Sequence, residues 1–338
     1  MRVREGDFIE TKDGLIFDVK GLVHPLNRVI AYLRYLKSPR GNRRRGRDRY
    51  LKVYSLPERD KILKERYPQY YYYDPVFGCY MQGVTHERIL KVYRPQDTIL
   101  RLLEKRHEID KVEEDALGLA ELIHDSAGIS LNRLGISGSV MVNLHNPDSD
   151  IDLIVYGRRS CIKVHETLQS LMEENSVVSR YSIKDLKRLF LFRSKDTSMP
   201  WRDFLRVERR KSMQGKFKGR DFFIRFVLDW DEFNERYGDK IYRPVGYSEI
   251  EATVIDASDS IFTPCIYVLD KVKILKGESV TDLREVVSFR GRFCQQAEDG
   301  DIIVARGKVE LVTEKGGDQY YRLVVGNKRS DYMIPKHL

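Results

Sequence analysis

The sequence predicts an α+β protein with three domains: an N-terminal α+β module over residues 1–95, a middle domain over 96–245 and a β-rich domain over 246–338. Three observations predict this class. Alternating apolar residues around a tight turn open the chain, apolar residues at helical spacing follow from residue 97, and short apolar runs divided by turns fill the last domain. Helices and strands that are segregated along the chain in this way are typical of α+β folds.

The N-terminal module begins with a predicted β-hairpin. Residues 8–11 and 15–19 flank Asp13-Gly14, a dipeptide that favours a two-residue turn. The apolar residues that come next fall at helical spacing, so a helix is predicted over residues 29–36.

Two segments concentrate positive charge. Residues 40–49 hold six arginines, and residues 202–220 hold eight basic residues against two acidic ones. Glycine and charge density predict that the first segment is a flexible loop, and the planar guanidinium group matches the geometry of phosphate oxygens. We therefore expect nucleic-acid contacts from this loop, with a solvated loop as the alternative; the expected contact residues are Arg43, Arg44, Arg45 and Arg47.

The middle domain starts with helical spacing over residues 97–123, and Gly128 is expected to end this helical stretch. A strand is predicted over 129–136. Amphipathic helices are predicted over 162–174 and 183–190.

Two short motifs lie at the centre of this domain. Gly138-Ser139 follows an apolar run and predicts a tight turn that opens a helix, with Ser139 at the N-cap and backbone N–H groups suited to a phosphate. Ten residues later, Asp150-x-Asp152 begins a second apolar strand. Since side chains alternate along a strand, both carboxylates lie on one face and can hold hard divalent cations such as Mg²⁺.

This combination resembles the nucleotidyltransferase superfamily of DNA polymerase beta, the CCA-adding enzymes and the minimal nucleotidyltransferases. Gly138, Ser139, Asp150 and Asp152 match its motif, and the resemblance covers roughly residues 115–230. It implies a mixed-sheet domain like the palm of polymerase beta, which would transfer a nucleoside monophosphate from a nucleoside triphosphate and release pyrophosphate. The Gly-Ser motif lies much farther from the N-terminus than in the CCA-adding enzymes, so CCA addition is not expected here.

The resemblance also implies a metal site. Asp150 and Asp152 would hold two Mg²⁺ ions, with Mn²⁺ as an alternative, about 3.5–4 Å apart. Ser139 and the N–H groups after it would bind the β- and γ-phosphates of the nucleotide. Family members often place a third carboxylate at the start of a neighbouring strand, where it serves as a metal ligand or a base.

Asp221 fits this third position, because it opens the apolar strand over 221–228. Asp229 and Asp231, at the far end of that strand, are the competitors. If this strand runs parallel to the strand of Asp152, the two strand starts meet at one edge and favour Asp221. Arg225 shares a face with Asp221 and is expected either to contact phosphate or to pair with an acid.

The composition is biased toward a polyanionic partner, with a highly charged surface as the alternative explanation. The net charge is +9 and the sequence pI is about 9.2. Together with the two basic segments this predicts RNA as the acceptor. A protein or small-molecule acceptor remains an alternative, and so does a non-catalytic nucleic-acid-binding protein with a degenerate transferase domain.

The remaining features predict a cytoplasmic protein without a membrane partner. The four cysteines are far apart and form no Cys-x-x-Cys pair, which is typical of reduced thiols. No apolar run approaches the ~20 residues that span a bilayer. The β-rich domain, with short strands over 249–255, 262–269, 271–275, 301–312 and 320–325, is predicted to be a small antiparallel barrel or sandwich.

Overall fold

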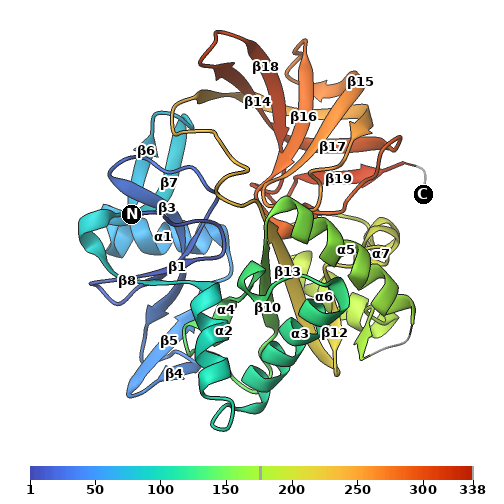
Figure 1. The fold of residues 1–338 in the computed structure, drawn as a ribbon. Helices are drawn as coiled ribbons and strands as arrows, with labels where there is room; N and C mark the ends of the chain where they lie inside the picture. The colour runs from blue at the N-terminus through green and yellow to red at the C-terminus, as the bar shows by residue number, and fades with distance from the viewer. Residues whose placement is uncertain (175–176, 337–338) are drawn as a thin grey trace. The chain divides into compact units, whose positions relative to one another are not determined.

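The computed structural model describes residues 1–174 and 177–336 and shows an α+β protein (Figure 1). The chain forms two compact units. The first unit comprises residues 1–72, 81–180 and 212–234, and the second comprises 73–80, 181–211 and 235–338. In the described part of the chain, no helix has both the length and the apolar character needed to cross a membrane.

The N-terminal part of the first unit is an antiparallel sheet. The strand order is β4-β5-β3-β2-β1-β8, and β7 pairs with β3 and with β6. Helix α1 (Leu56–Arg66) packs against β3, and Ser55 caps its N-terminus. The strands are β1 Phe8–Thr11, β2 Ile16–Val19, β3 Arg28–Lys37, β4 Arg43–Arg45, β5 Asp48–Lys52, β6 Tyr71–Asp74, β7 Cys79–Thr85 and β8 Ile89–Tyr93.

The helix predicted over residues 29–36 is wrong, because this segment is strand β3. The prediction failed because β3 buries side chains on both faces, for example Ile30 on one and Ala31 on the other. A strand that is buried on both sides lacks the apolar–polar alternation that identifies a half-exposed strand. The hairpin of β1 and β2 was predicted correctly.

Each face of this sheet belongs to a different core. Ile9, Phe17 and Leu33 pack with Leu63 of α1 in one cluster. On the other face, Phe8, Ile16, Tyr35 and Tyr50 pack with residues of the middle segment, namely Met141, Val142 and Leu144. This shared core joins the sheet to the middle segment, so the boundary predicted at residue 95 does not coincide with a boundary between units. The boundary predicted at residue 245 also differs from the boundaries of the units. The C-terminal part begins at residue 235, and residues 181–211 belong to the same unit.

The middle segment forms a mixed five-stranded sheet of order β11-β12-β13-β10-β9. β10 runs parallel to β13 and antiparallel to β9. Asp110 begins α3 with a capping box and Gly128 ends it in the left-handed conformation, as predicted for Gly128. The elements are α2 Pro95–Glu104, α3 Lys111–Ala127, β9 Leu134–Ile136, α4 Gly138–Met141, β10 Ile151–Tyr156, α5 Arg158–Glu173, β11 Val178–Ser179, β12 Gln214–Phe217 and β13 Arg220–Val227.

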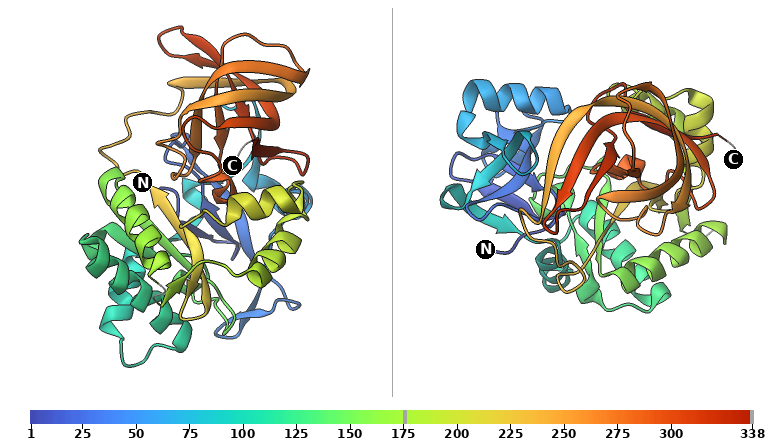
Figure 2. Two further views of the ribbon diagram at one scale, coloured as in Figure 1. Left: turned by 90° about the vertical axis from the view of Figure 1, so that its right-hand side faces the viewer. Right: turned by 90° about the horizontal axis from the view of Figure 1, so that it is seen from above.

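The second unit contains two helices and a β-barrel. β14 pairs with both β15 and β17, which closes the ring β14-β15-β16-β18-β17 and removes its free edges (Figure 2). The pairs in this ring are antiparallel except for β16 with β18, which is parallel. The elements are α6 Ile183–Arg193, α7 Trp201–Glu208, β14 Lys240–Asp256, β15 Cys265–Gly277, β16 Leu283–Ser288, β17 Ile302–Glu314, β18 Gln319–Val324 and β19 Tyr332–Pro335.

The arginine-rich segment 40–49 is a β-hairpin of β4 and β5, not a flexible loop. Arg43 is buried and donates to the carbonyl oxygen of Leu144 (3.2 Å) and to Ser149 Oγ (2.7 Å). Arg45 pairs with Glu10 at 2.5 Å. These two side chains are therefore occupied by internal contacts, whereas the predicted contact residues Arg44 and Arg47 are exposed.

We expect Arg43→Ala to lower the free energy of unfolding of the first unit by about 2–4 kcal/mol, because it leaves buried acceptors on two segments without a donor. Arg44→Ala, which removes the same side chain from an exposed neighbouring position, should change it by less than about 0.5 kcal/mol. Urea denaturation followed by circular dichroism measures both. Equal stability of the two variants would contradict the structural role of Arg43.

Candidate active site

The Gly138 turn lies directly against the second aspartate of the motif. The backbone N–H of Ser137 donates to the carbonyl oxygen of Asp152 (2.8 Å), and Ser137 Oγ donates to that of Gly6 (2.8 Å). Gly138 has a φ of 63°, and a Cβ at this position would lie 1.9 Å from Asp152 Oδ2. Any side chain at residue 138 would therefore collide with the carboxylate.

Ser139 follows in the first turn of α4. The N-cap is Ser137 and not Ser139, which corrects the position predicted for this serine. Ser139 is buried, and among the residues that the structure describes its Oγ has no hydrogen-bond partner. A buried hydroxyl without a partner costs about 1–3 kcal/mol, so this oxygen is available to a ligand.

Asp150 immediately precedes β10, and Asp152 is the second residue of this strand. Asp150 is exposed and Asp152 is partly buried. Burial and the negative charge of Asp150 raise the pKa of Asp152 to about 6, although Lys52, Arg34 and Arg225 act in the opposite direction. The ionised form of Asp152 is therefore disfavoured at this position, first by burial and then by repulsion from Asp150.

Arg34 of β3 and Lys52 of β5 bring positive charge to the pair. Burial and the adjacent Arg34 lower the pKa of Lys52, while Asp150 and Asp152 raise it. Burial lowers the pKa of Arg34, but nearby groups that include both motif aspartates raise it above its ordinary value. The exposed ring of Tyr54 lies beside both cations, 5.6 Å from the Arg34 guanidinium carbon and 5.1 Å from Lys52 Nζ.

A second hydroxyl without a partner lies close to the pair. Tyr35 is fully buried, and no described residue accepts or donates a hydrogen bond at its hydroxyl. Burial raises its pKa above the ordinary range, and Asp150 and Asp152 act in the same direction. Two unpartnered hydroxyls, Ser139 and Tyr35, therefore accompany the two carboxylates.

A small polar cavity of about 20 Å³ lies at Asp152, room for a single water molecule. Asp18 of β2 lines it. Burial raises the pKa of Asp18, but Lys20, Arg225 and Arg34 outweigh this effect and lower it to about 2. Ten residues line the cavity: Phe8, Asp18, Arg34, Ser137, Gly138, Asp152, Leu153, Ile154, Phe223 and Arg225.

The register of β10 and β13 bears on the third carboxylate. The strands are parallel, as the argument for Asp221 required, and Asp152 pairs with Phe223. Asp221 is two residues before Phe223 and so shares its face at the end of the sheet where Asp150 lies. It contacts Lys216 at 3.1 Å.

Asp229 and Asp231 follow the opposite end of β13. Asp229 forms ion pairs with Arg4 (2.9 Å) and with Arg133, which hold it beside Tyr156 at the far end of β10. Asp231 is exposed. The structure thus separates both competitors from Asp152 by the length of the strand.

Arg225, which was expected to contact either phosphate or an acid, pairs with an acid. Its NH1 donates to Glu5 Oε1 (2.7 Å) and lies 3.7 Å from Asp18 Oδ1. It still lines the cavity, where its charge lowers the pKa of Asp152.

Sequence reasoning missed Asp18, Arg34 and Lys52. All three precede the segment that resembles the nucleotidyltransferases, and nothing in their spacing connects them to the motif. The one available signal was a charged residue within an apolar strand, as at Asp18 between Phe17 and Val19.

A separate acidic cluster joins Asp110, Glu113 and His145. Both oxygens of Asp110 accept hydrogen bonds, one from backbone N–H groups of α3 and the other from His145 (2.7 Å). Glu113 accepts from Arg101 and from the Asp110 backbone. These contacts are those of the N-terminal cap of α3. The cluster shares no residue with the Asp150–Asp152 pair.

Comparison with known proteins finds a relative that matches almost the whole chain. The uncharacterized protein MJ1086 of Methanocaldococcus jannaschii is 33% identical over 340 residues, which cover 98% of each chain. No family model matches the chain, and no solved structure matches it.

The pKa of Asp152 predicts a pH-dependent stability difference. A carboxyl whose pKa is raised in the folded state stabilises the fold fully below its unfolded pKa of 3.8, and this contribution disappears as the pH rises through about 6. Without divalent cations, Asp152→Asn should therefore be more stable than the parent protein at pH 7.5, by up to about 3 kcal/mol, and nearly equal to it at pH 4.

Urea denaturation in EDTA at both pH values measures this difference. Asp148→Asn, at an exposed position of the preceding turn, is the matched control. It should leave the free energy of unfolding unchanged at both pH values. A stability difference for Asp152→Asn that is the same at pH 4 and pH 7.5 would contradict the raised pKa.

Proposed function

The chain belongs to the family of the Methanocaldococcus jannaschii protein MJ1086, and we propose that it is a metal-dependent nucleotidyltransferase acting on an RNA hydroxyl. It would transfer a nucleoside monophosphate from a nucleoside triphosphate. The observation that carries the proposal is the contact between Gly138 and Asp152. A turn that can accept no side chain lies directly against Asp152, and the residue after it is a buried serine whose hydroxyl has no hydrogen-bond partner among the described residues.

The carboxylate pair has the chemistry of a divalent cation site. Burial and the charge of Asp150 raise the pKa of Asp152, and a bound cation would favour the ionised form against both effects. Asp150 and Asp152 would hold Mg²⁺ or Mn²⁺, with Asp221 or Asp18 as a further oxygen donor. Bound there, the metal would neutralise developing phosphate charge and lower the pKa of the acceptor hydroxyl.

The other residues of the site suit a triphosphate. Arg34 and Lys52 are cations near the carboxylate pair and can bind phosphate oxygens that the carboxylates would otherwise repel. The Ser139 hydroxyl can donate to another phosphate oxygen. The absence of a side chain at Gly138 lets the triphosphate approach the backbone.

The proposed reaction is an in-line displacement at the α-phosphorus. The acceptor oxygen forms a bond to this phosphorus while the bond to the β-phosphate oxygen breaks and pyrophosphate leaves. The proton of the acceptor hydroxyl passes to a carboxylate, for which Asp221 is our candidate. Positioning and charge neutralisation supply most of the rate enhancement in reactions of this type.

The exposed arginines of the β4–β5 hairpin support RNA as the acceptor. Arg44 and Arg47 are exposed and belong to the same unit as Asp150 and Asp152. Guanidinium groups on a turn can contact the backbone phosphates of a strand that reaches the site. A protein or small-molecule acceptor would not require them.

Incubation with each α-labelled nucleoside triphosphate, Mg²⁺ and either total RNA, protein or metabolite extract tests the proposal. We expect label in RNA, and Asp150→Asn or Asp152→Asn should reduce it by at least about 10³-fold, because a metal ligand is lost. Asp148→Asn should retain nearly full activity. Label in protein or metabolites would keep the chemistry and reject the RNA acceptor, and no metal-dependent label in any pool would reject the transferase.

The third carboxylate is tested in the same assay. We expect Asp221→Asn to reduce transfer by about 10²–10⁴-fold, the usual contribution of a general base. Asp18→Asn should have a smaller effect, because Lys20 and Arg225 already neutralise that carboxylate. Asp229→Asn is the control. If Asp18→Asn were inactive while Asp221→Asn stayed active, the third carboxylate would be Asp18 of β2 and not Asp221.

A further inference from the structure

One aromatic side chain of the first unit differs from the others in its exposure. Among the phenylalanine, tyrosine and tryptophan residues that the structure describes in this unit, Tyr54 alone is exposed, with 47% of its surface accessible to solvent. The other rings of the unit are buried or partly buried. Packing in an apolar core therefore does not account for the position of this tyrosine.

The backbone that carries Tyr54 is held in place on both sides. Tyr54 lies between β5 and Ser55, the N-cap of α1. The backbone N–H of Val53 donates to the carbonyl oxygen of Arg34 (2.9 Å), and the guanidinium group of Arg59 donates twice to the carbonyl oxygen of Val53 (3.1 and 3.0 Å). The exposed ring is thus presented from a fixed segment, which lowers the conformational entropy that a ligand would have to remove on binding.

Two cations connect this ring to the carboxylate pair. The Arg34 guanidinium carbon lies 5.6 Å from the centroid of the Tyr54 ring and Lys52 Nζ lies 5.1 Å from it, both within the range of cation–π contacts. Burial acts to lower the pKa values of both cations, and the charges of Asp150 and Asp152 act to raise them. Arg34 also lines the cavity at Asp152. Arg34 is therefore common to the exposed ring and to the candidate active site.

The chemistry of these groups matches the parts of a nucleotide. Arg34 and Lys52 suit phosphate oxygens, and the exposed ring offers a π-face to a base. A ligand made of phosphate alone would use the two cations but would gain nothing from the ring. The ring therefore points to a ligand that carries both a phosphate and an aromatic group.

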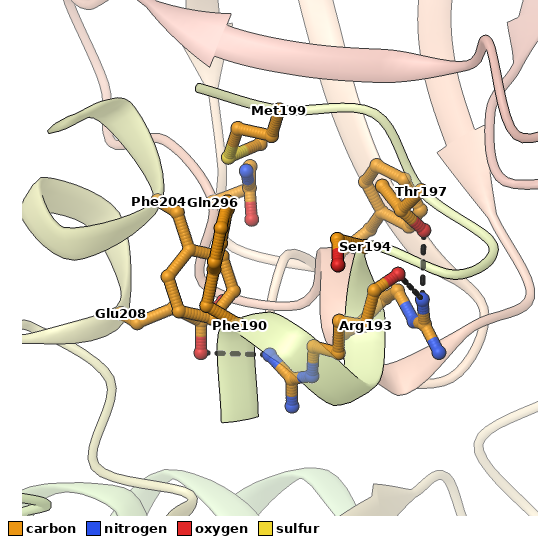
Figure 3. A pocket seen from close by; sticks show the side chains of 10 residues that line it. Phe190, Arg193, Ser194, Thr197, Met199, Phe204, Glu208 and Gln296 are labelled. Carbon is orange, nitrogen blue, oxygen red and sulfur yellow. Dashed lines mark hydrogen bonds and ion pairs between the residues drawn. The ribbon is translucent and has the colours of Figure 1, made fainter. Parts of the chain in front are cut away.

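The aromatic pocket of the second unit is not suited to such a ligand (Figure 3). Phe190, Phe204 and Phe293 line it together with Met199. It encloses about 20 Å³, room for one water molecule but not for a base. Its rings pack against one another, with the centroids of Phe190 and Phe204 5.2 Å apart, whereas the ring of Tyr54 is exposed to solvent.

We propose that the ring of Tyr54 is a stacking site for a nucleobase beside the candidate active site. The base belongs either to the nucleoside triphosphate whose phosphates bind Arg34 and Lys52, or to the terminal nucleotide of the RNA that supplies the acceptor hydroxyl. The inference deepens the proposed function and rests on it for the class of ligand. Every base has a π-face, so Tyr54 would favour nucleotides over other phosphates without selecting one base.

Calorimetry on the full-length protein in Mg²⁺ tests the first source, with each of the four nucleoside triphosphates and with inorganic tripolyphosphate, which has no base. Tyr54→Ala should weaken binding of the nucleotide by about 5- to 150-fold, the loss expected for one stacked base, and change binding of tripolyphosphate by less than about 2-fold. Tyr54→Phe keeps the ring and should bind like the parent protein. Tyr54→Leu keeps an apolar side chain beside Arg34 and Lys52 but has no π-face, so it should bind like Tyr54→Ala. Tyr73→Ala, which removes an exposed tyrosine of the second unit, is the control and should change neither affinity.

Anisotropy of a fluorescent RNA 12-mer, with and without its 3′-terminal base, tests the second source. If Tyr54→Ala weakens binding of the intact RNA but not of the RNA that lacks this base, the stacked base is that of the acceptor. If it weakens nucleotide binding alone, the stacked base is that of the triphosphate.

Three results would overturn the stacking site: no binding of nucleotide or RNA by the parent protein, unchanged binding of both by Tyr54→Ala, or full binding by Tyr54→Leu. Equal losses for nucleotide and tripolyphosphate would also overturn it, because the ring would then serve only to position the cations. Binding that depends on Tyr54 in a protein without transfer activity would reject the proposed transferase and keep the stacking site. Transfer activity that is insensitive to Tyr54→Ala, with unchanged binding, would do the reverse.

Discussion

The candidate active site depends on the close approach of two backbone segments at Gly138. The carboxylate of Asp152 occupies the space that a side chain at residue 138 would fill, and the backbone of Ser137 is hydrogen-bonded to that of Asp152. This contact fixes the turn against the first residues of β10. The next residue, Ser139, is buried, and within residues 1–174 and 177–336 its hydroxyl has no hydrogen-bond partner. The constraint is steric, so no other residue type can substitute for glycine without moving the strand.

The candidate active site also depends on the N-terminal sheet, which precedes the Gly-Ser motif in the sequence. Its two faces serve two cores, and the face toward the middle segment carries Tyr35 within a cluster that includes Met141 and Leu144. The same sheet brings Arg34 and Lys52 to the aspartates. Partly buried charges of both signs destabilise the fold unless they bind a ligand, and groups of this kind concentrate at functional sites. The stability that is lost here is offset by the two apolar cores on either side of the sheet.

Several basic side chains of the two arginine-rich segments are engaged inside the protein. Arg43, Arg45 and Arg220 are held by internal partners, and Lys211 is almost fully buried. Sequence charge counts therefore overestimated the basic surface of both segments. Exposed arginines of the β4–β5 hairpin, such as Arg44 and Arg47, still face solvent. Exposed arginines of this kind suit transient contact with a polyanion.

The sequence alone determined the features that depend on neighbouring residues. The Gly-Ser turn, the shared face of Asp150 and Asp152 and the helix end at Gly128 follow from local conformation and from the period of a strand, so they were predictable. The segment 29–36 was not, because burial on both faces removed the alternation. Nor could the sequence show that β2, β3 and β5 bring Asp18, Arg34 and Lys52 to the motif, or that Arg290 and Arg292 share Asp196. Those proximities join residues more than ninety positions apart, and only the packing of complete sheets and helices decides which distant side chains meet.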